Sequence, residues 1–323
     1  MKRIIVLLLL LGISGYTTAR DIRVHDPVMI RQANTYYLFC TGMGISVFSS
    51  TDMKNWKAEK PVFDTPPAWA VQNIPGFKGH IWAPDISFSN GVYYLYYSVS
   101  AFGKNTSCIG VATNQTLDPT DKNFKWVDHG KIIQSVPGRD LWNAIDPNLA
   151  YDDQQQPWLV FGSFWSGMKL VKMNADLKQV AQPEEWLTVA KRERSFKTDD
   201  KDPGEGAIEA PFIFKKNGFY YLFVSFDFCC RGVNSTYKVM VGRSDKVQGP
   251  YLDKNAVPLD QGGGTLVVQG NTAWNGVGHN STYTFDGKDY LVFHAYDAAD
   301  GGKPKLKIKE IKWTDGWPAV DLE

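Results

Sequence analysis

The amino-acid sequence predicts an all-β protein, a five-bladed β-propeller. A short apolar run rich in tyrosine occurs five times in the 323 residues, at intervals of roughly sixty residues. Strand units that repeat at a fixed period are typical of propellers, because a single blade cannot bury its faces without neighbours. The aromatic anchors of the five runs are Tyr36, Tyr93, Trp158, Tyr220 and Tyr290.

Each repeat unit reads as about four short strands. The tyrosine-rich run is followed by a second apolar stretch, as in CIGVAT from Cys108, and turn-rich segments such as RSDKVQGPY close most units. Sustained helical periodicity is almost absent. A β-sandwich is the alternative for such strands, but it does not explain why four of the runs are preceded by a proline. These prolines are Pro27, Pro84, Pro147 and Pro211.

Residues 1–19 have the pattern of a secretory signal peptide: Lys2 and Arg3, an apolar run over 4–11, and small residues before Arg20. The mature chain, residues 20–323, is expected to be one propeller domain, secreted or periplasmic. The apolar run is too short to span a bilayer, so no membrane attachment is expected after its removal. We expect a monomer.

Charge excludes several classes of partner. The chain carries 35 Lys and Arg and 34 Asp and Glu, so loss of the two cations of the signal gives (35 − 2) − 34 = −1. Nucleic acid is therefore not expected as a partner. The eleven tryptophans favour a neutral carbohydrate instead.

Of the four cysteines, Cys229 and Cys230 are adjacent, and the sequence leaves open free thiols, a bridge between them, or separate partners.

The recurring prolines point to a shared site. Equivalent loops of all blades meet at one mouth of a propeller channel, and Asp26, Asp146 and Glu209 lie just before three of the prolines. His279 has the matching place in the fifth unit, which lacks the proline. An Asp before a proline is also a common turn former, but Asp26 and Asp146 at equivalent blade positions favour a common cavity.

Glu209 lies in the apolar segment GAIEAPFIF, so we expect partial desolvation to raise its pKa, as a proton donor requires. Two carboxyl groups on opposite sides of a cleft are the minimal apparatus for hydrolysis of a glycosidic bond. The sequence has no His-Glu-x-x-His zinc motif, no phosphate-binding loop and no Gly-x-Ser-x-Gly elbow.

Six motifs in order resemble the endo-α-1,5-L-arabinanases of glycoside hydrolase family forty-three: VHDPVMI, GHIWAPDIS, NAIDPNL, EGAIEAPFIF, FDFCCRGVNSTY and GHNSTY. The resemblance covers nearly the whole mature chain. It implies a five-bladed propeller, an inverting mechanism, and arabinan, a polymer of α-1,5-linked L-arabinofuranose, as the substrate.

The resemblance also implies roles for individual residues. Asp26 would be the general base, Glu209 the general acid, and Asp146 the residue that raises the pKa of the acid and orients it. His279 matches a histidine near a metal ion, most often calcium, held mainly by waters in the channel. Without the family, His279 reads as a hydrogen-bonded channel residue, because calcium prefers oxygen ligands.

Further residues resemble the lining of the sugar cleft: His25, Trp82 and Phe102 as aromatic walls, and Asn143, Ser163 and Tyr237 as polar contacts. For Phe102, Ser163 and Tyr237, ordinary packing or loop hydrogen bonding is an equal alternative. The adjacent cysteines would be structural in the fourth blade.

Two other functions fit parts of the pattern. A β-xylosidase or α-L-arabinofuranosidase of the same family would keep the fold and the acids. Such relatives often carry an added C-terminal β-sandwich, whereas this chain stops soon after its fifth blade. A sugar-binding propeller without catalysis would need the aromatic residues but not the three acids.

Overall fold

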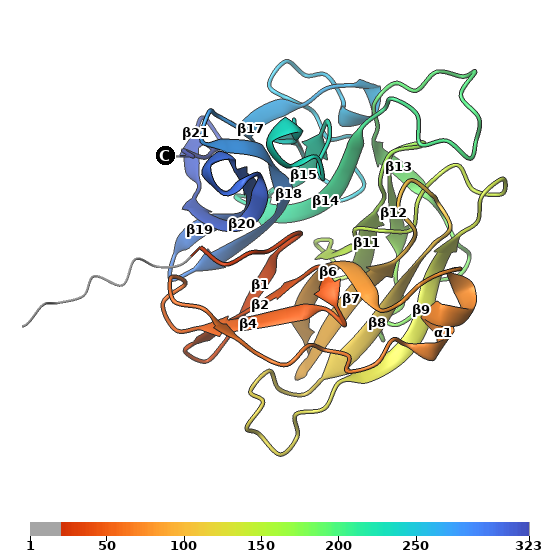
Figure 1. Ribbon diagram of the computed structural model, residues 1–323. Helices are drawn as coiled ribbons and strands as arrows, with labels where there is room; N and C mark the ends of the chain where they lie inside the picture. The colour runs from red at the N-terminus through yellow and green to blue at the C-terminus, as the bar shows by residue number, and fades with distance from the viewer. Residues whose placement is uncertain (1–20, 323) are drawn as a thin grey trace, which may run out of the picture.

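The strands form five antiparallel sheets around a common axis in the computed structural model, which describes residues 21–322 (Figure 1). The predicted signal peptide, residues 1–19, lies outside the described residues. The first blade consists of β1 Val28–Gln32, β2 Thr35–Cys40, β4 Ser46–Ser50 and β5 Lys57–Ala58, and the second of β6 His80–Ser89, β7 Val92–Val99, β8 Ser107–Asn114 and β9 Val127–Ser135, with β3 Gly42–Met43 paired to β6. The third blade consists of β10 Asn148–Tyr151, β11 Pro157–Phe161, β12 Met168–Lys172 and β13 Leu187–Ala190, and the fourth of β14 Ile208–Lys216, β15 Phe219–Phe226, β16 Lys238–Ser244 and β17 Thr265–Gln269. The fifth blade consists of β18 Trp274–Phe285, β19 Lys288–Asp297 and β20 Lys303–Glu310. The other elements are α1 Ala68–Asn73, the short 3₁₀ turns η1 Gly232–Asn234, η2 Leu259–Gln261 and η3 Ala298–Asp300, and the hairpin β21 Lys312–Thr314 and β22 Trp317–Ala319.

The predicted repeat is confirmed. The five tyrosine-rich runs are the second strands of the blades, β2, β7, β11, β15 and β19. The fifth blade differs from the expected four strands, because its sheet has three. The start of the described chain lies along its outer strand, where the Leu306 N–H donates to the Ile22 carbonyl at 3.0 Å and Arg23 forms a bridge with Lys305. The two ends of the chain therefore close the ring, which protects an otherwise open sheet edge.

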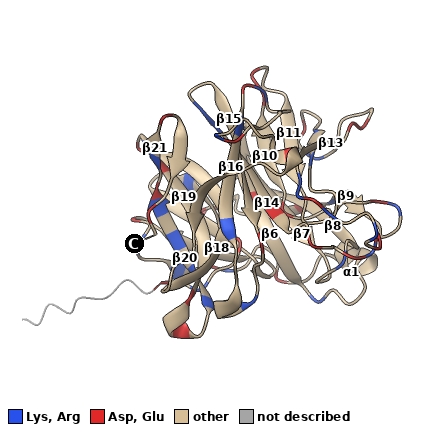
Figure 2. Ribbon diagram, turned by 90° about the horizontal axis from the view of Figure 1, so that it is seen from above, with Lys and Arg blue, Asp and Glu red and all other residues tan. Residues whose placement is uncertain are grey.

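Apolar side chains fill the spaces between blades. One cluster joins Met29 and Leu38 of the first blade to Val292 and Leu306 of the last. On the outer surface, basic and acidic residues are interspersed (Figure 2), and Lys303 and Lys305 of β20 pair with Asp300 at 2.6 and 2.7 Å. Within residues 21–322, no helix has the length and apolar character needed to cross a membrane.

Polar bonds join the inner strands around the channel. The Asp85 carboxylate in β6 accepts hydrogen bonds from the Asn148 side chain at 3.1 Å and the Leu149 N–H at 2.9 Å in β10. The Asn148 side-chain oxygen accepts from the Ile213 N–H of β14 at 2.8 Å. Three consecutive blades are thereby connected through two buried side chains.

The buried Asp85 should make stability depend on pH. Burial raises its pKa from 3.8 to about 6, although the bonds from Leu149 and Asn148 oppose the rise. Between these two pH values the folded protein holds a proton that the unfolded chain has lost, so the free energy of unfolding decreases as pH rises. Asp85→Asn removes this titration. Its free energy of unfolding, relative to wild type, should increase by about 2 kcal/mol between pH 4 and pH 7.

Urea denaturation at several pH values measures this difference. The exposed Asp286→Asn is the matched control, and its curve should run parallel to that of wild type. Parallel curves for wild type and Asp85→Asn would contradict the assignment.

Candidate active site

The residue that the sequence repeat places at the channel mouth has the same unusual backbone in every blade. The φ angles are positive at all five equivalent positions, although none is a glycine. Four of the five directly precede a proline, where this conformation is further disfavoured. Such strain is maintained only where surrounding structure fixes it, and it is concentrated at functional sites. The five residues are Asp26 (54°), Ala83 (41°), Asp146 (59°), Ala210 (55°) and His279 (49°).

A ring of hydrogen bonds between blades holds these five residues. In each case a side chain of the preceding blade accepts the backbone N–H. For the first blade, the accepting side chain comes from the fifth blade. The bonds are Asp26 N–H to His294 Nδ1 (3.2 Å), Ala83 N–H to Thr41 Oγ1 (2.9 Å), Asp146 N–H to Ser98 Oγ (3.0 Å), Ala210 N–H to Asp146 Oδ2 (3.1 Å) and His279 N–H to Ser225 Oγ (2.9 Å). Closure of the propeller therefore places Asp26 and Asp146 at one mouth, together with Glu209, which directly precedes Ala210 and whose charge acts on Asp146.

Asp26 is a buried carboxylate surrounded by donors. It is 7% exposed, and its Oδ1 lies 2.7 Å from His25 Nδ1 and 2.9 Å from His279 Nδ1. Its Oδ2 accepts the Thr41 hydroxyl at 2.5 Å. Burial alone would raise the pKa of Asp26, but the two imidazoles outweigh it and hold the pKa well below the usual value. Asp26 is therefore ionised at neutral pH and can accept a proton from water.

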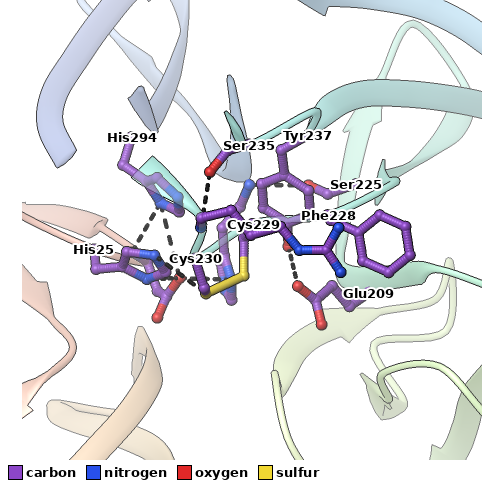
Figure 3. The surroundings of a disulfide bond; sticks show 12 residues. His25, Glu209, Ser225, Phe228, Cys229, Cys230, Ser235, Tyr237 and His294 are labelled. Atoms are coloured by element: carbon purple, nitrogen blue, oxygen red, sulfur yellow. Dashed lines mark hydrogen bonds and ion pairs between the residues drawn. A yellow bond between two sulfur atoms is a disulfide. The ribbon is translucent and has the colours of Figure 1, made fainter. Parts of the chain in front are cut away.

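Glu209 is held by two hydroxyl groups. Ser163 Oγ donates to Glu209 Oε2 at 2.7 Å, and Tyr237 Oη donates to Glu209 Oε1 at 2.6 Å; Figure 3 shows the tyrosine bond. Glu209 itself is half-buried at the start of β14. Ser163 and Tyr237, which the resemblance implied as substrate contacts, thus bind the expected acid directly and fix its orientation.

Asp146 is the carboxyl group whose environment favours the protonated form. It is 6% exposed. Burial raises the pKa of Asp146, the charges of Glu209 and Asp26 raise it further, and His279 opposes the rise. The sequence placed the effect of desolvation at Glu209, whereas in the structure Asp146 is the more deeply buried of the two. At neutral pH the environment of Asp146 therefore favours its protonated form.

The remaining predicted residues lie at varying distances from the acids. Trp82 is half-buried, and its indole N–H donates to His80 Nδ1 at 2.8 Å. Asn143 is buried, and its side-chain oxygen accepts the Ser107 hydroxyl at 2.6 Å. Phe102 is 80% exposed in the loop between β7 and β8. Within the described chain, none of these three hydrogen-bonds to the three acids, so their contact with sugar stays a prediction.

Several residues of the site were not predicted from the sequence. Thr41, Ser98 and Ser225 lie at or just after the ends of second strands, where they bond to the next blade. His294 and Tyr296 of β19 stack on or bond to His25. A signal was present, because a small hydroxyl residue recurs after four of the five tyrosine-rich runs and a histidine interrupts the fifth.

Thr41→Val tests the support of Asp26. The threonine hydroxyl donates to the carboxylate and accepts the Ala83 N–H, so its loss should reduce kcat about tenfold and stability by about 1–3 kcal/mol. Ser225→Ala is the control, because it breaks the equivalent bond to His279 N–H without touching a carboxylate. Steady-state kinetics and thermal unfolding of both variants give the comparison. Equal losses of activity would show that Thr41 acts only through the ring of bonds.

One imidazole has the arrangement of a metal ligand. His279 Nδ1 faces the Asp26 carboxylate, which leaves Nε2 as the ring nitrogen that could bind an ion. A carboxylate behind a histidine is the usual outer support of a metal-ligating imidazole. His279 Nε2 is therefore the atom that would hold the predicted ion, and the metal stays a prediction. Because calcium prefers oxygen, waters would supply most of the other ligands.

This propeller has carboxyl groups from different blades at one channel mouth, one kept ionised and another in surroundings that favour its protonated form. These groups are the apparatus of a glycoside hydrolase. Comparison with known proteins agrees. The profile of Glycosyl hydrolases family 43 matches residues 21–318, and the chain belongs to this family. The predicted family and the predicted fold are both confirmed.

Relatives include exo-acting and endo-acting enzymes. The chain is 55% identical over 304 residues to the extracellular exo-α-(1→5)-L-arabinofuranosidase of Cellvibrio japonicus, covering 94% of this chain and 88% of the relative. It is 44% identical over 301 residues to the extracellular endo-α-(1→5)-L-arabinanase 1 of Bacillus subtilis, covering 92% and 87%. The structure of Cellvibrio cellulosa α-L-arabinanase complexed with arabinohexaose matches with a TM-score of 0.92 at 55% identity, over 94% of this chain and 96% of that one.

Proposed function

We propose that this glycoside hydrolase cleaves the α-1,5-L-arabinofuranosidic bonds of arabinan outside the cytoplasm, with inversion at the anomeric carbon. The proposal depends on one observation: two carboxyl groups with different surroundings face the channel mouth from different blades. Asp26 is ionised, and Glu209 accepts hydrogen bonds from two hydroxyl groups. The charges of both groups act on Asp146. The similarity to enzymes named for α-(1→5)-L-arabinan linkages supports the choice of sugar.

In this mechanism Asp26 removes a proton from a water as its oxygen attacks the anomeric carbon. Glu209 gives its proton to the glycosidic oxygen as the bond from that oxygen to the anomeric carbon breaks. His25 and His279 keep Asp26 charged, and the Thr41 hydroxyl directs its second oxygen. Asp146, whose pKa is raised by burial and by the charges of Glu209 and Asp26, would favour its protonated form near both catalytic acids. Exchange with solvent then removes the proton from Asp26 and returns one to Glu209.

A calcium ion at His279 Nε2 is a further part of the proposal. When bound, it would supply positive charge near Asp26, whose carboxylate contacts the other nitrogen of His279. We expect purified enzyme to contain about one calcium per chain, and His279→Ala to lose it. Elemental analysis measures the content, and His129→Ala, which changes an exposed histidine of β9, is the matched control. A chelator should also lower the melting temperature of wild type but not of His279→Ala. Wild-type enzyme without calcium would contradict this assignment.

Export and assembly also belong to the proposal. The two bacterial relatives are named extracellular, and residues 1–19 have the pattern of a cleaved signal. The mature enzyme would act as a monomer without a membrane anchor. N-terminal sequencing of the exported protein tests the cleavage after residue 19. Light scattering measures its mass and tests the monomeric state.

Product analysis tests the activity itself. Early digests of linear arabinan, separated by anion-exchange chromatography, should contain arabino-oligosaccharides. A ladder of lengths would indicate internal cleavage, and one dominant oligomer would indicate attack from a chain end. Faster hydrolysis of nitrophenyl β-xyloside or α-arabinofuranoside than of arabinan would favour the alternative enzymes of the family, and no turnover of any of these would favour a sugar-binding protein.

A further inference from the structure

The two adjacent cysteines form a disulfide at the catalytic site. Cys229 and Cys230 are joined in the segment between β15 and η1, beside His25 (Figure 3). Cys229 is half-buried and Cys230 is exposed. The other two cysteines, Cys40 and Cys108, are buried free thiols in the cores of the first two blades. The question left open by the sequence is thus answered by a bridge between neighbours.

A chain of three short contacts connects this disulfide to Asp26. The backbone N–H of Cys230 donates to Tyr296 Oη at 2.7 Å. Tyr296 Oη lies 2.7 Å from His25 Nε2, and His25 Nδ1 lies 2.7 Å from Asp26 Oδ1. The tyrosine oxygen that accepts the Cys230 N–H can donate its own proton to His25 Nε2, which lies within hydrogen-bond distance. The imidazole proton is then on Nδ1, facing the carboxylate.

The disulfide restrains the first donor of this chain. A bond between neighbouring cysteines closes a ring of eight atoms that includes their peptide group. Cys230 has a φ of 67°, a left-handed conformation that a residue with a side chain adopts at a cost. Without the ring, Cys230 can relax to a negative φ, and its N–H then turns away from Tyr296. The Cys230 sulfur, 3.8 Å from His25 Nε2, would become a thiol that competes for the same nitrogen.

We propose that the Cys229–Cys230 disulfide positions the catalytic base, by holding the Cys230 N–H on Tyr296 so that Tyr296 fixes the orientation and tautomer of His25 against Asp26. The two cysteines are positioning residues that act through Tyr296 and His25. This inference rests on the proposed role of Asp26 in hydrolysis of arabinan.

Selective reduction tests the proposal. A water-soluble trialkylphosphine converts the disulfide to two thiols while the phosphine and one water become the phosphine oxide. Thiol titration of denatured protein should rise from two groups to four. We expect kcat on linear arabinan to decrease about tenfold, the loss of one oriented hydrogen bond, with KM changed less than about twofold. Reoxidation should restore kcat. The double variant Cys229→Ser, Cys230→Ser should have the low kcat and should not respond to the phosphine.

Tyr296→Phe separates positioning from general loss of structure. It removes the connecting hydroxyl and leaves the disulfide intact, so its kcat should also decrease about tenfold. Reduction of this variant should then produce less than about a twofold further loss, because both changes break the same chain of contacts. The proposal would be overturned if reduced Tyr296→Phe showed the product of the two separate losses in kcat. It would also be overturned if fully reduced wild type kept its full kcat. Failure of untreated wild type on arabinan would instead overturn the proposed function.

Discussion

Glu209→Gln should lower kcat/KM on linear arabinan by about 10³-fold, because an amide has no proton to give to the leaving oxygen. Glutamine has nearly the same shape and still offers an oxygen to the Ser163 or Tyr237 hydroxyl, so the fold should be retained. Release of reducing sugar measures the loss. Glu59→Gln, which changes a glutamate bonded to Ser49 on the outside of the first blade, is the matched control and should keep full activity.

The leaving group distinguishes an acid from a residue that only binds substrate. Nitrophenolate departs with little help from a proton, so on nitrophenyl α-L-arabinofuranoside the Glu209→Gln enzyme should lose less than about tenfold. A similar loss on both substrates would contradict the assignment of Glu209 as the general acid.

Asp26→Asn should lower activity by about 10³-fold on both substrates, because attack by water needs the base whatever group departs. The amide also removes the negative charge to which His25 and His279 are oriented. The exposed Asp286→Asn, which weakens only a surface pair with Arg31, should be fully active.

The stereochemistry of the wild-type product tests the same assignment. If Asp26 activates water, the first product seen by NMR should be the β-anomer, inverted from the α-linkage of the substrate. An α-anomer as first product would instead indicate a covalent intermediate.

Asp26 and Asp146 show how far the repeat by itself determines the chemistry. They are the same residue type, they precede equivalent prolines, and they have nearly the same φ, 54° and 59°. Their pKa values nevertheless move in opposite directions. Two imidazoles keep the pKa of Asp26 low against its burial, whereas burial and the charge of Glu209 raise the pKa of Asp146. Of the neighbours that decide this difference, His279 and Glu209 come from other blades, whereas His25 directly precedes Asp26 in the sequence.

The amino-acid sequence determined the five blades, their second strands and the three acids at one mouth. Apolar periodicity is a local property of the strand sequence, so it can be recognised along the chain. The tertiary structure alone decided that residues 22–23 complete the fifth blade and that Ser163 and Tyr237 hold Glu209. It also placed the Cys229–Cys230 disulfide beside His25. These contacts join distant parts of the chain, and no local pattern specifies them, because they arise only when the ring of blades closes.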